Sequence, residues 1–300
     1  MKKIIIALSV LTIMAGNVFS QSIINRYSHL GEMFVPQFSS APFPHPDRAN
    51  GRLYNNQTFS AQEHYSDSSV AIFILKGFKP TATTNIVVYF HGWNNNIDSA
   101  CVQFKLIEQF STSNKNAIFV FPQGPKNSPD SFGGRLEDKD GLKNLVDDVL
   151  KYIQDIKNIK RITVGSIILA GHSGAYRIIS FCLMRGGLTT NISDVILFDA
   201  LYGETEKYSY WIDHSNGRFI NIYTDSGGTK KETENLMADL DGWKIPHLSK
   251  EEKDVTELDL KQNRILFIHS ELSHNEVIGA NNQFRTFLST SKIETIKYEK

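Results

Sequence analysis

Seven short apolar runs, separated by segments with a helical pattern, constrain the fold of this chain more than any other sequence feature. The runs are rich in β-branched and aromatic residues and do not alternate with polar ones, and they lie at 70–77, 86–90, 117–121, 166–170, 195–199, 219–223 and 264–268. Strands that are buried on both faces of a parallel sheet have this character, because neither face meets water. Helical segments between such strands imply right-handed crossovers, so we predict a doubly wound α/β sheet with helices on both faces.

The clearest helical pattern lies at 141–157, where apolar residues recur every three or four positions. This spacing places them on one stripe that can pack against a sheet. We expect further helices at about 98–110, 174–184, 232–240 and 276–288, the first of them capped by the side chain of Asp98.

The N-terminus has the features of an export signal. Lys2 and Lys3 precede an almost wholly apolar stretch at 4–13, and small residues then approach Ser20. This order predicts a signal peptide at 1–20, cleaved between Ser20 and Gln21, and a secreted or periplasmic protein. No later segment reaches the roughly 20 apolar residues that a membrane span needs, so we expect no integral membrane segment in the mature chain.

The rest of the chain divides into two parts. Residues 21–69 are rich in Ser, Asn, Pro and aromatics, which predicts an irregular segment that packs on the main domain. Residues 70–300 hold all seven apolar runs and form that domain. Within it, the stretch 241–262 is polar and has no strand pattern, so we expect an insertion before the last strand.

Composition and cysteine usage exclude several classes of function. Lysine and arginine together number 32, as do aspartate and glutamate, so the net charge is zero and no electrostatic surface for nucleic acid is predicted. Cys101 and Cys182 each fall in an amphipathic segment, which is typical of small buried apolar residues. No Cys/His cluster has metal-ligand spacing, so we predict no metal and no cofactor.

The pentapeptide GHSGA, residues 171–175, directly follows the apolar run at 166–170 and precedes a helical segment. A strand, a sharp turn and a helix present a serine as a nucleophile, provided that the residues two before and two after it are small. Gly171 and Ala175 meet this requirement. The sequence therefore predicts Ser173 as the nucleophile, with the N–H of Gly174 facing the substrate at a helix N-terminus.

A His-Gly pair, His91 and Gly92, directly follows the apolar run at 86–90. A loop of this kind upstream of the nucleophile supplies a second donor to the oxyanion of a tetrahedral intermediate. Fixed N–H groups stabilise such an oxyanion by several kcal/mol. We expect the N–H of Trp93 to act there with that of Gly174, and the side chain of His91 to order the loop.

A strand with an HG loop, then a strand, GHSGA and a helix, then acid and histidine candidates in that order, together resemble the α/β-hydrolase superfamily. The resemblance covers about residues 70–290. It implies an eight-stranded, mostly parallel sheet and a catalytic triad in the chain order serine, acid, histidine. The seven runs leave one strand to be found, which we expect at 51–69.

The catalytic histidine of the superfamily follows the last strand, where this sequence has His269 and His274. His269 directly abuts the apolar run at 264–268 and can simply end the strand. His274 lies in the loop before the final helix, which is where the superfamily places its base. We favour His274, since a loop there can bring the imidazole to the serine hydroxyl.

Two aspartates are candidates for the acid. Asp225 follows the run at 219–223, the position that the superfamily uses most often, whereas some members take the acid one strand earlier, where Asp199 closes the run at 195–199. A carboxylate at the end of a wholly apolar strand is costly to bury unless it is paired, for example with an imidazole. Asp225 precedes Ser-Gly-Gly and can be a solvated turn residue. We therefore favour Asp199, with Asp225 as the alternative.

Together these features predict a secreted serine hydrolase that cleaves a small-molecule or polymer-linked ester through an acyl-enzyme. Aromatic and amide residues expected near the site suit a polar or sugar-linked acyl ester, and they are Trp93, Asn94, Asn95, Asn96, Phe132, Tyr176 and Tyr202. A peptidase or amidase would use the same triad and is the alternative. A binding protein without catalysis is less consistent with the sequence, because candidates for all three triad members are present.

Overall fold

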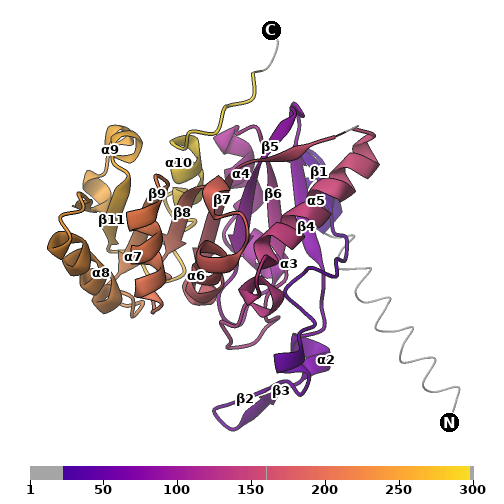
Figure 1. Cartoon of the computed structure of the whole chain (residues 1–300), viewed down its shortest axis with the longest axis horizontal. Helices are drawn as coiled ribbons and strands as arrows, with labels where there is room; N and C mark the ends of the chain where they lie inside the picture. The colour runs from indigo at the N-terminus through magenta and orange to yellow at the C-terminus, as the bar shows by residue number, and fades with distance from the viewer. Residues whose placement is uncertain (1–22, 160, 298–300) are drawn as a thin grey trace, which may run out of the picture.

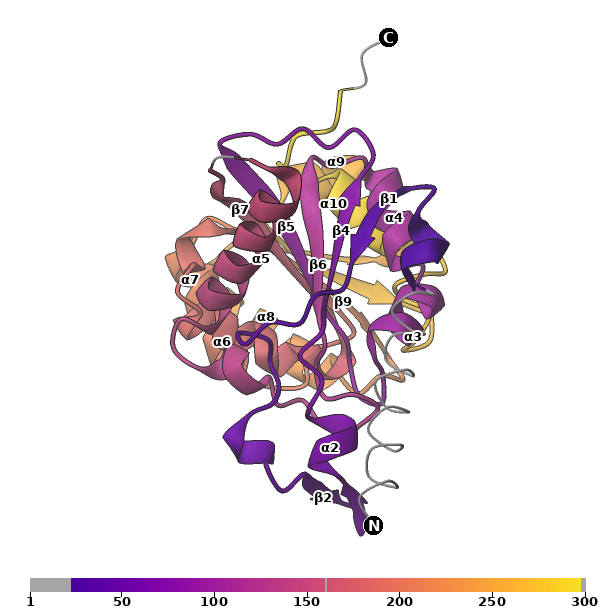
Figure 2. The same ribbon diagram turned by 90° about the vertical axis from the view of Figure 1, so that its right-hand side faces the viewer.

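The computed structural model describes residues 23–159 and 161–297, so the predicted signal peptide at 1–20 lies outside the described residues. A nine-stranded sheet runs through the molecule in the order β1-β4-β6-β5-β7-β8-β9-β11-β10, and helices pack on both of its faces (Figures 1 and 2). The sheet is parallel from β6 to β10, whereas at one edge β4 pairs antiparallel with β6 and β1 pairs antiparallel with β4. The predicted doubly wound α/β fold is confirmed, with nine strands rather than eight.

All seven apolar runs form strands of this sheet. They are β4 (Val70–Leu75), β5 (Thr83–Phe90), β6 (Ala117–Pro122), β7 (Thr163–His172), β8 (Ile192–Phe198), β9 (Arg218–Thr224) and β11 (Ile265–Ser270). Their central residues are buried on both faces of the sheet. Apolar and polar residues do not alternate in these strands because, as predicted, neither face meets water.

The two remaining strands lie at the edges of the sheet and were not predicted. β1 (Gly31–Phe34) pairs with β4, and β10 (Leu248–Glu251), inside the polar stretch 241–262, pairs with β11. The prediction of an eighth strand at 51–69 is wrong. That range instead holds β2 (Arg52–Tyr54) and β3 (Gln57–Phe59), which form a separate two-stranded hairpin. Short edge strands are partly exposed and carry no continuous apolar run, which is why the sequence pattern did not reveal them.

Nine helices connect and cover the strands within the described ranges. They are α2 (Ala61–His64), α3 (Ile97–Gln103), α4 (Leu106–Ser113), α5 (Gly141–Lys157), α6 (Tyr176–Arg185), α7 (Thr205–His214), α8 (Lys230–Gly242), α9 (Glu257–Gln262) and α10 (Gln283–Ser289). α5 has the predicted bounds. The helix expected at 98–110 is two helices, because Lys105 has a left-handed φ of +51°, and the side chain of Asn96, not Asp98, caps the first.

Each face of the sheet has its own hydrophobic core. α5, α6, α7 and α8 cover one face, and α3, α4 and α10 cover the other, as the edge-on view shows (Figure 2). Cys101 on α3 and Cys182 on α6 are buried on opposite faces and are not joined by a disulfide. None of the helices in the described part of the chain is long and apolar enough to cross a membrane.

Candidate active site

The predicted nucleophile lies on a sharp turn between β7 and α6. Ser173 directly follows the last residue of β7 and has a φ of +56°, a conformation that is strained for a residue other than glycine. The turn brings strand and helix so close that a Cβ on Gly171 would lie 2.6 Å from the Cβ of Ala175 and 2.8 Å from Cδ1 of Ile179. Only glycine fits at position 171, and the side chain of Ser173 stays partly exposed.

The HG loop after β5 passes directly against this serine. A Cβ on Gly92 would lie 2.5 Å from the Cβ of Ser173, and a Cβ on Gly174 would lie 2.5 Å from Cδ1 of the Trp93 ring. Within the residues that the structure describes, neither the N–H of Trp93 nor that of Gly174 donates to a protein acceptor. Both N–H groups therefore remain available to a negatively charged oxygen beside Ser173.

His91 holds this loop in place. Its Nδ1 lies 2.7 Å from the carbonyl oxygen of Gly92, which can only accept, so Nδ1 carries the hydrogen. Nε2 accepts from the N–H of Gly124 at 3.2 Å and from the amide of Gln123 at 2.9 Å. Burial lowers the pKa of His91 to about 4, which keeps the ring neutral at neutral pH. Fixing the carbonyl of Gly92 also fixes the peptide plane that carries the N–H of Trp93.

His274 and Asp199 are brought together from positions 75 residues apart. Nδ1 of His274 lies 2.7 Å from Oδ2 of Asp199, which is completely buried at the end of β8. The imidazole itself is about a quarter exposed, with 27% of its side chain open to solvent. A neutral imidazole that donates from Nδ1 presents Nε2 as an acceptor, which is the arrangement that a general base requires.

The carboxylate of Asp199 is enclosed by hydrogen-bond donors. Oδ1 accepts from the N–H of Thr224 at 3.2 Å and from the hydroxyl of Thr229, and Oδ2 accepts from the hydroxyl of Thr224 at 2.8 Å. A Cβ on Gly227 would lie 1.6 Å from Oδ2, so the backbone of that loop packs directly on the carboxylate. Burial alone would raise the pKa of Asp199, but the hydrogen bonds from His274 and the two threonines outweigh it, and the pKa is lowered.

Comparisons with known proteins agree with this architecture. No protein-family model matches the sequence, and none of the curated proteins does. Among solved structures, a substrate-bound fluorophosphonate-binding serine hydrolase from Staphylococcus aureus is similar (TM-score 0.51, 8% identity, over 87% of this chain and 99% of that one). A ferulic acid esterase is similar to the same degree (TM-score 0.51, 11% identity, over 87% and 98%).

A third similar structure is a mutant of the feruloyl esterase module from Clostridium thermocellum complexed with sinapinate (TM-score 0.50, 11% identity, over 90% and 91%). The chain has the α/β-hydrolase fold. The resemblance that the sequence motifs indicated is thereby confirmed at the level of the fold. In an α/β-hydrolase fold, ligands bind at the carboxyl edge of the parallel strands, and this is the edge where Ser173, Asp199 and His274 all lie.

The alternative acid, Asp225, and the alternative base, His269, pair with each other. Asp225 is 62% exposed and pairs with Lys230 at 2.7 Å. His269 lies 3.2 Å from Asp225 through Nε2 and 2.8 Å from Glu251 through Nδ1. The structure thus brings Asp199, not Asp225, to His274, and the catalytic roles of these residues stay a prediction.

His172, directly before the nucleophile, was missed by the sequence analysis. Its Nε2 donates to the backbone carbonyl of His274 at 2.8 Å, and the two imidazole rings lie 4.5 Å apart. Burial, with a smaller contribution from His274, lowers the pKa of His172 to about 3, so the ring is neutral. This residue positions the backbone that carries the predicted base. Its place beside Ser173 in the motif was the only available signal.

Tyr202 covers the site from the loop after β8. Its hydroxyl donates to the carbonyl of Gly227 and makes a polar contact with Ser173, and its ring lies 6.3 Å from that of His274. Burial, followed by the nearby charge of Asp199, raises the pKa of Tyr202 to about 12. Within the described ranges no hydrogen bond joins Oγ of Ser173 to Nε2 of His274. Such bonds are often long in the absence of substrate and tighten when it binds.

Of the loop residues predicted near the substrate, some lie at the site and others support the fold. Trp93 and Tyr202 lie beside Ser173 and remain 40% and 36% exposed. Phe132 is buried in a small aromatic cluster of the N-terminal segment, and the side chain of Asn96 caps α3. The aromatic character expected around the site is therefore real, but part of the predicted set only supports the fold.

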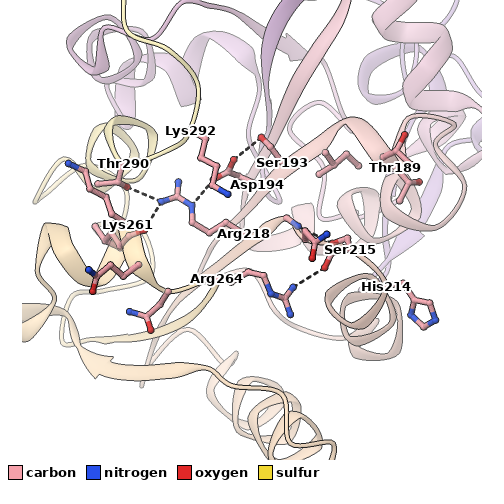
Figure 3. Close-up of a pocket in the computed structure, with 17 residues that line it drawn as sticks. Thr189, Ser193, Asp194, His214, Ser215, Arg218, Lys261, Arg264, Thr290 and Lys292 are labelled. Atoms are coloured by element: carbon pink, nitrogen blue, oxygen red, sulfur yellow. Dashed lines mark hydrogen bonds and ion pairs between the residues drawn. The ribbon is translucent and has the colours of Figure 1, made fainter.

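A cavity of about 530 Å³ lies at the opposite edge of the sheet, where β8, β9 and β11 begin (Figure 3). Three helices, α7, α9 and α10, end at this cavity. Arg264 donates from Nη1 to the carbonyls of Ile212 at 2.9 Å and Ser215 at 3.2 Å, which are the unpaired acceptors at the end of α7.

Arg218 serves the other two helix ends in the same way. It donates to the carbonyls of Leu260 in α9 at 3.0 Å and Phe287 in α10 at 2.8 Å, and it pairs with the buried carboxylate of Asp194 at 2.6 Å. Helix C-termini carry partial negative charge, so the two arginine side chains stabilise these helix ends. Arg218 and Arg264 together bind carbonyls at the ends of all three helices at this cavity.

Proposed function

We propose that this chain is a serine hydrolase that cleaves carboxylic esters, with Ser173 as the nucleophile, His274 as the base and Asp199 as the acid. The observation that carries the proposal is the 2.7 Å hydrogen bond between His274 and the buried Asp199, at the same sheet edge as a serine held at a positive φ. A buried carboxylate that fixes an imidazole beside a strained serine is the arrangement of acyl-transfer enzymes.

The geometry supports a two-step reaction. Nε2 of His274 accepts the proton of the Ser173 hydroxyl as Oγ attacks the ester carbonyl, and the tetrahedral oxyanion accepts hydrogen bonds from the N–H groups of Trp93 and Gly174. His274 then gives the proton to the departing alcohol, which leaves an acyl group on Ser173. Water, deprotonated by the same imidazole, releases the acid and restores the serine.

Asp199 keeps this imidazole in the required state throughout. It accepts from Nδ1–H, so the lone pair stays on Nε2, and its negative charge stabilises the imidazolium that forms in each step. The lowered pKa of Asp199 keeps the carboxylate ionised at neutral pH. The similar structures include a ferulic acid esterase and a feruloyl esterase module, which is why we propose ester rather than amide cleavage.

Export is the second part of the proposal. The charged start, the apolar stretch and the small residues before Gln21 support a signal peptide, so the hydrolase would act in the periplasm or outside the cell. Its substrate would then be an ester found there, either a free molecule or a polymer-linked one.

The nucleophile is tested with the chain 21–300 and its Ser173→Ala variant. Wild-type protein should hydrolyse methyl butyrate in a pH-stat assay and should be labelled covalently by a fluorophosphonate, and Ser173→Ala should lose both without a change in far-UV circular dichroism. Ser193→Ala, at the opposite edge of the sheet, is the matched control and should keep both. Turnover of Ser173→Ala at the wild-type rate would contradict the proposal.

A further inference from the structure

The hairpin of β2 and β3 projects from the body of the molecule and takes no part in the main sheet (Figures 1 and 2). We propose that this hairpin, through Tyr54, forms with Trp93 a binding subsite for a ring in the substrate, next to the scissile ester. The proposal rests on the proposed function, because it names the class of ester that the site accepts: esters that carry an aromatic or other flat ring.

The contact between the hairpin and the catalytic loop is aromatic. The rings of Tyr54 and Trp93 lie 5.5 Å apart at an interplanar angle of 79°, and the guanidinium of Arg52 lies 5.1 Å from the Tyr54 ring and 5.9 Å from the Trp93 ring. Arg52 contacts both rings, and the part of each ring that stays exposed is open to a further partner. Trp93 is 40% exposed, so part of its ring beside the proposed nucleophile is open to a ligand.

The aromatic surface of Tyr54 and Trp93 lies next to the atoms proposed to react. Trp93 supplies one of the two N–H groups proposed for the oxyanion, and its ring packs against Gly174, the residue after the nucleophile. An ester whose carbonyl oxygen binds these N–H groups therefore has one of its two substituents beside the Trp93 ring. Tyr202, which contacts Ser173, forms a second aromatic pair with Tyr176, with rings 6.0 Å apart.

One short loop holds both halves of the subsite. Nη1 of Arg52 lies 2.7 Å from Oδ1 of the buried Asp130 and donates to the carbonyl of Pro129 at 2.6 Å. The hydroxyl of Ser131, which follows Asp130 in the chain, accepts from the indole Nε1 of Trp93 at 2.7 Å. An isolated two-stranded hairpin is marginally stable in water, so this anchoring fixes Tyr54 in place before substrate binds.

The chemical class follows from these groups. Two aromatic rings offer flat apolar faces and the guanidinium offers a cation–π contact, so a ring gains more here than an alkyl chain does. The ring can belong to the acyl group or to the alcohol. Two matched pairs of unactivated esters separate these cases: methyl 3-phenylpropanoate against methyl butyrate, and benzyl acetate against propyl acetate.

The test measures kcat/KM for each pair in the chain 21–300 and in Tyr54→Ala, Tyr54→Phe and Leu53→Ala. Tyr54→Ala should lower the ratio of ring-bearing to ring-free ester by about threefold to tenfold in one of the two pairs. Tyr54→Phe keeps the ring and should restore the ratio. Leu53 is the matched control, because it is the neighbouring residue of β2, points to the opposite face and is 70% exposed.

Each outcome decides the proposal. A fall in the first pair supports a ring in the acyl group, and a fall in the second pair supports a ring in the alcohol. An unchanged ratio in both pairs, in a Tyr54→Ala chain with wild-type circular dichroism, overturns the subsite while the proposed esterase stands. If Tyr54→Ala does not fold, Tyr54→Leu replaces it, since leucine keeps apolar volume without a ring. A wild-type chain that hydrolyses no ester and takes up no fluorophosphonate overturns both proposals.

Discussion

Lowering the pH from 7 to 5 should destabilise this protein through two histidines that the fold keeps neutral. His91 and His172 are 7% and 3% exposed, and burial lowers their pKa from 6.5 to about 4 and to about 3. Below pH 6.5 the unfolded chain binds a proton at each histidine, whereas the folded chain does not until the pH approaches the lowered value. The free energy of unfolding therefore falls as the pH falls through this window.

The size of the effect follows from the width of the window. One pH unit of differential proton binding corresponds to about 1.4 kcal/mol per group. Between the unfolded value of 6.5 and pH 5, each histidine contributes a loss of roughly 2 kcal/mol, and the two together contribute roughly 4 kcal/mol. Such a loss is a large part of the 5–15 kcal/mol by which most domains are stable.

The measurement is urea unfolding at pH 7 and pH 5, followed by tryptophan fluorescence, for the chain 21–300 and for His172→Gln. Glutamine cannot titrate and keeps an amide donor for the carbonyl of His274, so the variant should lose about 2 kcal/mol less than the wild type between the two pH values. All other titrating groups are present in both chains and cancel in this difference. An equal loss in the two chains would show that His172 is not held neutral and would refute the reasoning.

The remaining predictions concern the acid and the mature end of the chain. Asp199→Asn should lower kcat/KM for methyl butyrate by up to about 10⁴, because the amide no longer stabilises the His274 imidazolium. Asp225→Asn, at an exposed position, should stay within about tenfold of wild type. The reverse order would identify Asp225 as the acid. Mass spectrometry of the protein from its native host should find a chain that starts near Gln21, and an intact Met1 in cytosolic material would contradict export.

The parts of the fold that could be predicted are those with a local cause. Strands β5, β7 and β8 are buried on both faces, so the lack of alternation in their sequences reports their place directly. The edge strands β1 and β10 are short and partly exposed, so no apolar run marked them.

The residues of the candidate site also divide into those with a local sequence signal and those without one. Ser173 and the HG loop belong to compact motifs, and the cost of an unpaired buried carboxylate pointed to Asp199 beside an imidazole, which is where the structure has it. His172 and Tyr54 act through contacts with segments distant in the chain. Neither periodicity nor spacing reveals such contacts, and only the place of His172 beside Ser173 in the motif gave a signal.

The enclosure of Asp199 by the backbone at Gly227 has a consequence for the medium in which this protein works. Dissolved ions screen exposed charges over about 8 Å at physiological ionic strength, but they screen buried pairs much less. Salt should therefore weaken the exposed pair of Asp225 and Lys230 more than the hydrogen bond between His274 and the fully buried carboxylate of Asp199. The contact that orients His274 should accordingly differ less between brine and fresh water than the exposed ion pairs do.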